Sequence, residues 1–398
     1  MSRIHPIYEA MEPTIFEHMS GLANALGAIN LGQGFPDGPP SPDMIDAAAR
    51  ALREKSNQYP PAFGLPELRD AIGRFYARRQ GLTLTREQVI VTSGATEALA
   101  ATLLALVNPG DEVILFQPAY DSYAPMVRRA GGTPVSVALS PPAWHYEADA
   151  LERAITPRTR VLIFNDPLNP AGKVASDSEL ARIAEACRQH DLVAICDEVW
   201  EDVRFDGATH HSLWSLPGME QRTVKIGSAG KIFGLTGWKT GWLCAAPEMA
   251  RSIGRAHQFL TFTTPPALQW AVAEGLDRPD SWFAAQRADW AAARSHLSRG
   301  LAAAGFAVLP SQATWFLCID LTASGIALDD RVFAERAVRE AGVASIPVSA
   351  LFEGEGPRHI LRLCFTKDYA VLDEAVARLA RFRDQVAAEV RPESQPQA

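Results

Sequence analysis

The stretch RVLIFNDPLNPAGKVASDSELARIAEACRQHDLVAICDEVWED, residues 160–202, contains the pattern that decides the fold. A short apolar run, VLIF, leads into a polar turn, then into a segment with helical periodicity, and then into a second apolar run, LVAI. Short runs rich in Val, Ile and Leu that lack polar alternation are typical of parallel strands buried on both faces. The stretch therefore predicts a strand, a covering helix and a second parallel strand.

The same alternation extends from this stretch in both directions. Strand-like runs stand before it at VIVTSG, DEVILF and TPVSVAL and after it at RTVKIG and GWLCAA, with helical patterns between several of them. From about residue 280 the pattern changes to long helices with a few strands, among them ATWFLCIDL and HILRLCF. We therefore predict an α/β fold, with a mostly parallel sheet sandwiched by helices and a smaller α+β domain built from both chain ends.

The predicted organisation divides the chain into four parts. Residues 1–45 form an N-terminal arm that contributes to the small domain, and residues 46–284 form the large domain. Residues 285–390 form the small C-terminal domain, and residues 391–398, within the polar end RPESQPQA, form a disordered tail. The length of 398 residues suits two or three domains of about 150 residues each.

Composition excludes several classes of function. The chain has 47% hydrophobic residues, a net charge of -8 and no basic block, so neither nucleic acid nor an anionic membrane surface is expected as a partner. No apolar run approaches the roughly 18–20 residues of a membrane span, and the opening MSRIHPIYEAMEP lacks the apolar core of a secretory signal. The 5 cysteines are odd in number and form no CxxC pair, which favours free thiols in a reducing cytoplasm.

Small and polar residues follow four of the predicted strands. They are the segment Ser93-Gly94-Ala95-Thr96, Asn169, Asp197, and the segment Ser228-Ala229-Gly230-Lys231. Each has a plain structural alternative: a helix N-cap by Ser93 or Thr96, a turn residue, a buried loop cap and a solvated lysine. Ligands of parallel α/β sheets bind beyond the carboxyl ends of the strands, so all four are expected at one edge. That convergence favours a binding site more than any one motif does.

Three charged residues have the chemistry of a site for a carbonyl cofactor and a carboxylate. Lys231 follows small residues in an otherwise apolar loop, where a desolvated lysine can form a Schiff base. Asp197 ends an apolar run, where an unpaired carboxylate is costly, so a cationic partner such as a protonated pyridine nitrogen is expected. Arg362 lies inside the strand-like ILRLCF, where it forms either a bidentate grip on a carboxylate or a structural ion pair.

In their order along the chain these residues resemble the class I/II aminotransferases of pyridoxal-phosphate fold type I, over about residues 12–383. The resemblance rests on the phrases NLGQGFPDGPP, NQYPPAFGLPELRDAI, SGATEAL, QPAYDSYAPM, NDPLNPAGKV, CDEVWED, IGSAGKIFGLTGWKTGW and LRLCFTKD. They are similar to one branch, which includes kynurenine/glutamine, methionine and succinyldiaminopimelate aminotransferases.

The resemblance implies a role for each residue of the site, with pyridoxal 5'-phosphate (PLP) as cofactor and no metal. Lys231 would hold the cofactor covalently, Asp197 would pair with its pyridine nitrogen, and Tyr120 would stack on its ring. Its phosphate would be bound by Ala95, Thr96, Ser228 and Lys239, and by Tyr59 from the second subunit of a homodimer. Asn169 would bind the phenolic oxygen of the cofactor and contact the substrate, whose α-carboxylate would be held by Arg362 and the backbone of Gly34.

One departure from the family pattern lies in the cofactor site. The family usually has Tyr where this chain has Trp200, and that Tyr donates a hydrogen bond to the same phenolic oxygen as Asn169. An indole N–H can also donate, but its bulk differs. The chain also has Lys239 where many relatives have Arg.

The activity that the resemblance implies is ping-pong transfer of an amino group from an L-amino acid to a 2-oxo acid. Methionine, glutamine, aromatic or kynurenine-like amino acids and a diaminopimelate precursor all stay open as donors. Ile15, Phe16, Phe262 and Thr263 either line the side-chain pocket or belong to the core or the dimer contact. One alternative is β-elimination of cysteine conjugates on the same scaffold. A non-catalytic sensor is disfavoured, because such sensors carry an N-terminal DNA-binding domain and only about a dozen residues precede the matching region.

Overall fold

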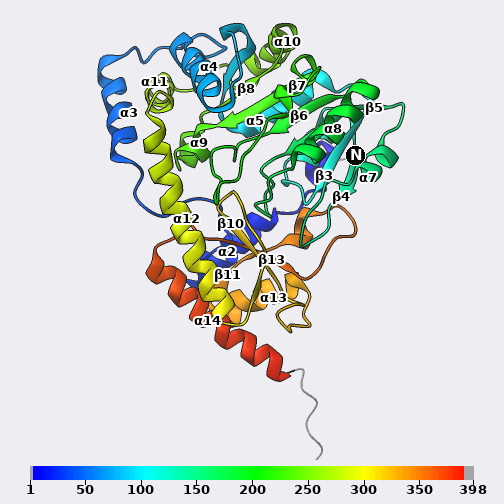
Figure 1. The fold of residues 1–398 in the computed structure, drawn as a ribbon, viewed down its shortest axis with the longest axis vertical. Helices are drawn as coiled ribbons and strands as arrows, with labels where there is room; N and C mark the ends of the chain where they lie inside the picture. Colours follow the sequence, from blue (N-terminus) through cyan, green and yellow to red (C-terminus); the bar gives the residue numbers. More distant parts are fainter. Residues whose placement is uncertain (1–2, 390–398) are drawn as a thin grey trace, which may run out of the picture.

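The computed structural model describes residues 3–389, and a seven-stranded sheet lies at its centre (Figure 1). The strand order is β2-β8-β7-β6-β5-β3-β4. The strands are β2 (Val89–Thr92), β3 (Glu112–Gln117), β4 (Thr133–Ala138), β5 (Thr159–Asn165), β6 (Val193–Asp197), β7 (Thr223–Ser228) and β8 (Gly241–Cys244). Only β8 runs antiparallel to its two neighbours in this sheet. The predicted α/β fold with a mostly parallel sheet is confirmed.

Alternate residues of the central strands face two separate helical layers. In β5, Val161 and Ile163 belong to a core shared with helix α5, whereas Leu162 and Phe164 belong to a second core shared with helix α8. Because both faces are covered, the strand is apolar without interruption. The helices of this part of the chain are α3 (Pro42–Glu54), α4 (Pro66–Gln80), α5 (Gly94–Leu106), α6 (Tyr123–Arg129), α7 (Ala148–Ala154), α8 (Asp177–Gln189), α9 (Ala229–Ile232), α10 (Pro247–Gln258) and α11 (Pro266–Leu276).

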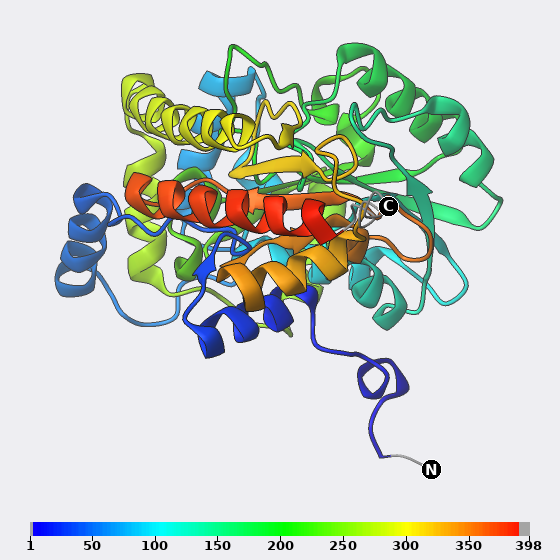
Figure 2. The ribbon, with the colours of Figure 1, turned by 90° about the horizontal axis from the view of Figure 1, so that it is seen from below.

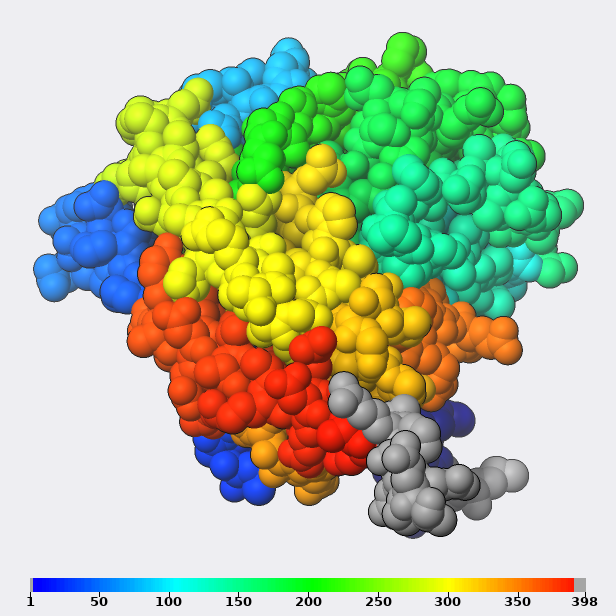
Figure 3. All heavy atoms as spheres, turned by 60° about the horizontal axis from the view of Figure 1, so that its bottom comes forward, coloured from blue at the N-terminus to red at the C-terminus, as the bar shows by residue number. Residues whose placement is uncertain are grey.

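A smaller antiparallel sheet, with the order β12-β13-β10-β9, adjoins the central sheet (Figure 1). Its strands are β9 (Ala307–Val308), β10 (Phe316–Asp320), β12 (Ile346–Pro347) and β13 (Ile360–Cys364). Helices α12 (Asp280–Ala303), α13 (Asp330–Arg336) and α14 (Tyr369–Glu389) surround it, and α12 and α14 lie side by side on the face shown in Figure 3.

The two ends of the chain meet in this smaller unit. Strand β1 (Ile29–Asn30) pairs in parallel with β11 (Val343–Ala344). Helix α2 (Ile15–Leu26) packs against the same region, while α1 (Pro6–Glu9) projects with the N-terminal arm (Figure 2). The predicted domain boundaries stay a prediction, and the predicted tail at 391–398 lies outside the described residues. Within residues 3–389, no helix combines the length and apolar character needed to cross a membrane.

The register of the central sheet places the polar strand ends at one level. Asn165, the last residue of β5, pairs with Asp197, the last residue of β6. Strand β7 ends at Ser228, and the short helix α9 then carries Lys231. The carboxyl ends of these neighbouring strands therefore present their polar side chains at the same edge.

Candidate active site

A cavity of about 700 Å³ lies at this edge. Residues from the central sheet, the smaller sheet and the N-terminal segment line it. It collects all of the predicted site residues except Tyr59, namely Gly34, Ala95, Thr96, Tyr120, Asn169, Asp197, Trp200, Ser228, Lys231, Lys239 and Arg362. The structure thus brings together residues that are more than 300 positions apart in the sequence.

Asp197 lies buried at the end of β6. Its carboxylate accepts a hydrogen bond of 2.5 Å from the hydroxyl of Tyr123 and a longer one, 3.4 Å, from the backbone N–H of Val199. Its backbone carbonyl accepts a hydrogen bond from the side-chain amide of Asn165 at 2.8 Å. Burial raises the pKa of the Asp197 carboxyl, and the bond from Tyr123 opposes that shift. The carboxylate is thus fixed in orientation, and a cation in the cavity would stabilise its charge.

Lys231 extends from α9 into the cavity without a polar partner. Among residues 3–389 its amine has neither a hydrogen bond nor an ion pair, but it lies 4.8 Å from the ring centroid of Trp200 and 5.3 Å from that of Trp315. Burial lowers the pKa of the amine to about 8, while Asp197 raises it. An amine with this pKa is neutral far more often near neutral pH than an exposed lysine, and the neutral form is the one that a nucleophile requires.

Arg362 is buried in β13 and has no ion-pair partner among the described residues. Its guanidinium donates hydrogen bonds to the side-chain oxygen of Asn169 at 3.1 Å and to the carbonyl of Gly32 at 2.6 Å. It stacks on the ring of Phe316, 3.9 Å from the centroid, and its buried Nε has no acceptor. Burial lowers the pKa of the guanidinium to about 10. A buried cation without a carboxylate is costly, so this geometry suits an anionic ligand that enters the cavity.

The first turn of α5 lines the same cavity and has the features of a second anion site. The first N–H groups of a helix have no intrahelical acceptor, and Ser93 makes no side-chain capping bond here. Gly94 has a φ of +77°, and a Cβ there would lie 3.3 Å from the amine of Lys239. A Cβ at Gly241 would lie 2.8 Å from the backbone nitrogen of Ala95. Glycines therefore keep the lysine and the helix N-terminus close together, as a phosphate cradle requires.

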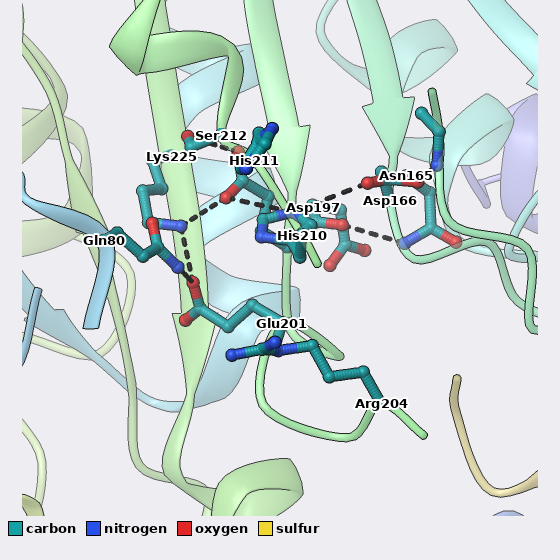
Figure 4. A network of polar contacts seen from close by, with 12 residues as sticks. Gln80, Asn165, Asp166, Asp197, Glu201, Arg204, His210, His211, Ser212 and Lys225 are labelled. Atoms are coloured by element: carbon teal, nitrogen blue, oxygen red, sulfur yellow. Dashed lines mark hydrogen bonds and ion pairs between the residues drawn. The ribbon is translucent and has the colours of Figure 1, made fainter. Parts of the chain in front are cut away.

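A buried network of charges begins at the residue after Asp197 (Figure 4). The Lys225 ammonium binds the carboxylates of both Glu198 and Glu201, and the bond to Glu201 is 2.5 Å long. Glu201 also accepts hydrogen bonds from Gln80 at 2.6 Å and from the hydroxyl of Tyr76 at 2.7 Å. The two carboxylates outweigh the cost of burial and raise the pKa of Lys225. These charges are satisfied internally and are not among the residues that line the cavity.

Tyr59 is the predicted site residue that lies outside the cavity. Its side chain is 83% exposed and packs edge-on against Phe262, at 5.4 Å between ring centroids. Of the four candidates for the side-chain pocket, only Phe16 lines the cavity, where its ring lies 4.9 Å from the Arg362 guanidinium. Ile15 packs against the core, and Phe262 and Thr263 are not among the residues that line the cavity.

Several residues of the site were missed by the sequence reasoning. Tyr123 follows Tyr120 by three positions, and its bond to Asp197 depends on α6 starting there. Asn165 stands directly after the VLIF run, so its position at a strand end was a usable signal. Phe316 is the first residue of β10 in the smaller sheet and Trp315 directly precedes it, and no local pattern places them beside Lys231 or Arg362.

The comparisons with known proteins agree with this geometry. The family model for aminotransferase class I and II matches residues 27–379. A probable N-succinyldiaminopimelate aminotransferase of Mycobacterium tuberculosis is 44% identical over 392 residues, covering 96% of this chain and 98% of that protein. The methionine aminotransferase of Escherichia coli is 36% identical over 370 residues, covering 93% and 96%.

Solved structures give the same result. The N-succinyldiaminopimelate aminotransferase from Mycobacterium tuberculosis superposes with a TM-score of 0.91 at 44% identity, covering 95% of this chain and 99% of that one. An aspartate aminotransferase from Thermus thermophilus superposes with a TM-score of 0.88 at 31% identity, covering 96% and 100%. The predicted family resemblance is therefore confirmed. The chain belongs to the class I and II aminotransferases of fold type I, and it is a transaminase.

Proposed function

We propose that this transaminase carries PLP in the cavity and that Lys231 binds it covalently. One observation carries the proposal: a partnerless amine, a buried carboxylate, a helix N-terminus with a lysine and an unpaired guanidinium all face one cavity. These groups match the aldehyde, the pyridine nitrogen and the phosphate of PLP and the carboxylate of an amino acid. When bound, the cofactor supplies an electron-accepting ring that stabilises negative charge on the substrate Cα.

The residues of this chain supply binding, orientation and proton transfer. Asp197, held by Tyr123, would keep the ring nitrogen of the cofactor protonated. The Lys231 amine, whose pKa burial lowers to about 8, would move the proton at the substrate Cα, because a group with a pKa near the working pH can both take and return a proton. Arg362 holds the α-carboxylate and thereby fixes the position of Cα relative to Lys231.

The charged residues that line the cavity limit which side chains an amino donor can have. The cations that line it within residues 3–389 are Lys231, Lys239 and Arg362, and each has a role assigned above. The carboxylates of Glu17 and Asp121 also line it. We therefore propose a donor with an uncharged side chain, such as methionine, glutamine or an aromatic amino acid, because an additional carboxylate would meet Glu17 or Asp121 without a free cation. The relatives include enzymes named for methionine and for kynurenine, at 36% identity, and one named for N-succinyldiaminopimelate, at 44% identity, so the proposal rests on the charges of the cavity.

A panel of amino donors tests this proposal. With 2-oxoglutarate as acceptor, we expect kcat/KM for methionine, glutamine and kynurenine to exceed that for N-succinyldiaminopimelate. A Glu17→Lys variant should raise the relative rate for the anionic donor, while Glu17→Gln, the matched neutral variant, should raise it less. A wild-type preference for N-succinyldiaminopimelate would contradict the proposed donor class and would indicate a cation supplied by a second subunit.

We also propose a homodimer in which Tyr59 reaches the phosphate of the neighbouring site. Tyr59, Phe259 and Phe262 are 83%, 86% and 38% exposed, which is unusual for large hydrophobic side chains on a free surface. Sedimentation should give twice the chain mass, and Tyr59→Phe should weaken PLP binding without dissociating the dimer. A monomer with full activity would contradict this proposal.

The 5 cysteines are all buried and unpaired, which supports a cytoplasmic location.

A further inference from the structure

The two indoles nearest to the Lys231 amine suggest a role for Trp200 that differs from that of the tyrosine it replaces. We propose that Trp200 and Trp315 act as positioning residues that hold the Lys231 nitrogen against their ring faces and favour its protonated form. We call this pair the indole clamp. The inference rests on the proposed function, because it concerns the lysine that is assigned there to the cofactor.

Geometry supports the clamp. The Lys231 amine lies over both rings, 4.8 Å from the centroid of Trp200 and 5.3 Å from that of Trp315. A cation within about 6 Å of a ring face is attracted by the electrons of the ring, and Trp is the strongest partner. The two rings meet edge to face, with centroids 4.9 Å apart and an interplanar angle of 82°. Each ring therefore holds the other in place.

Burial fixes the clamp and gives it electrostatic weight. Trp200 is 3% exposed and Trp315 is fully buried. Trp200 packs further against Phe316, at 5.5 Å between centroids, and Trp315 against Trp290 of α12, also at 5.5 Å. In such a desolvated setting a cation–π contact is stronger than at a surface.

Neither indole N–H group has a hydrogen-bond acceptor among the described residues. The indole N–H of Trp315 is buried without an acceptor. That of Trp200 has no hydrogen-bond partner within residues 3–389. The contact of Trp200 with the catalytic lysine is thus made through its ring face.

The clamp acts against a set of other influences on the lysine. Burial, Arg362 and Lys239 lower the pKa of the Lys231 amine, whereas Asp197 and Cys364 raise it. The two aromatic faces also favour the protonated amine, as Asp197 and Cys364 do, but they bring no formal charge that would attract water. They also restrict where the amine can move once it is free of the cofactor. The replacement of the usual Tyr by Trp200 thereby places a larger ring face, and a stronger cation–π partner, over the lysine.

The test is a pH titration of the visible absorbance of the PLP-loaded enzyme, which reports protonation of the nitrogen that joins Lys231 to the cofactor. We expect Trp200→Leu to lower that apparent pKa by about 0.5–1 unit, which is about 0.7–1.4 kcal/mol and lies within the range of a desolvated cation–π contact. Trp200→Phe, which keeps a ring face, should lower it less. Trp315→Phe should also lower it slightly, and Trp290→Phe, which alters the same aromatic cluster without removing a ring over Lys231, should leave it unchanged.

The opposite outcome separates the clamp from the role of the tyrosine. If Trp200 instead donated its N–H to the phenolic oxygen of the cofactor, its loss would strengthen the hold of that oxygen on the shared proton, and the pKa would rise. A rise, or no change, in Trp200→Leu would overturn the clamp. A protein that shows no cofactor absorbance in its wild-type form would instead overturn the proposed function, so the two failures are distinguishable.

Discussion

Two lysines, six residues apart, show how this protein uses one charge for structure and leaves another free for chemistry: Lys225 is fully buried and Lys231 is half-buried at the cavity. Lys225, on β7, binds Glu198 and Glu201, which raise its pKa. Lys231, just beyond the same strand, has only ring faces and a distant carboxylate, and burial lowers its pKa to about 8. The first lysine is charged and inert, while the second is available for covalent chemistry. Since the residue type is the same, the difference lies in the partners that surround each amine.

The largest expected effect comes from removing the chemical lysine. Lys231→Ala should reduce the rate of the amino-donor half-reaction by about 10³-fold or more, because the proposed covalent link and the proposed acid–base group would both be lost. The unfolding free energy should fall little, since the amine has no polar partner among residues 3–389 that would be left behind. Stopped-flow absorbance with methionine measures the rate. A Lys231→Ala variant with near wild-type turnover would contradict the assignment of Lys231 as the reactive lysine.

Removing Lys225, the lysine of the buried network, should mainly reduce the stability of the protein, whereas removing Lys231 should mainly reduce the reaction rate. Lys225→Met leaves two carboxylates buried without their cation, and we expect a loss of about 3–5 kcal/mol in the unfolding free energy. Urea denaturation measures it. The double variant Lys225→Met/Glu198→Gln should recover part of the loss, because one of the two orphaned charges is then removed. A Lys225→Met protein as stable as the wild type would show that the network is not satisfied as described.

Substitution of Arg362 tests whether this cation serves ligand binding, as proposed, or stability, as Lys225 does. Arg362→Leu should lower kcat/KM for amino donors by about 10- to 150-fold, because charge-assisted hydrogen bonds to the α-carboxylate are lost. Its stability should change little, because the removal of a buried charge that has no ion-pair partner among the described residues offsets the loss of its hydrogen bonds to Asn169 and Gly32. Arg362→Lys should fall between the two in kcat/KM. A large loss of stability with unchanged kcat/KM would assign Arg362 to the fold.

The pH dependence of stability has opposite sign for the two lysines. In protein freed of cofactor, Lys231 has a pKa of about 8 when folded and of about 10.5 when unfolded, so between these values the unfolded chain binds more protons. Relative to Lys231→Ala, the wild type should therefore gain stability as the pH rises from 8 to 10.5. The raised pKa of Lys225 contributes stability that is present below pH 10.5 and is lost only at higher pH. Thermal unfolding of both proteins across this range measures the difference, and a wild type that loses stability relative to Lys231→Ala would contradict it.

Much of the cavity was predictable because its residues stand beside strand ends. Asp197 closes an apolar run and Lys231 follows another, so the topology of a parallel sheet brings them to one edge. The fold class was predictable for the same reason, since strands buried on both faces have uninterrupted apolar sequences. The short helix α7 was not predicted, because its 7 residues bury only Leu151.

What the sequence could not supply is contact between distant elements. Trp315 stands 115 positions after Trp200, and their packing depends on how the smaller sheet meets the central one. Lys225 looks like an ordinary strand residue, and only the neighbouring Glu198 and Glu201 make it the centre of a network. Tyr59 lies outside the cavity of a single chain, so its role depends on a second copy.

The most direct test of whether Lys231 binds PLP is to reduce the PLP-loaded enzyme with borohydride and to identify the labelled peptide by mass spectrometry. We predict that the phosphopyridoxyl group is fixed on Lys231 and that Lys225 stays unmodified, because only the partnerless amine is available for reaction. A label on another lysine, or none at all, would contradict the assignment of Lys231 and the contrast between the two lysines on which this account rests.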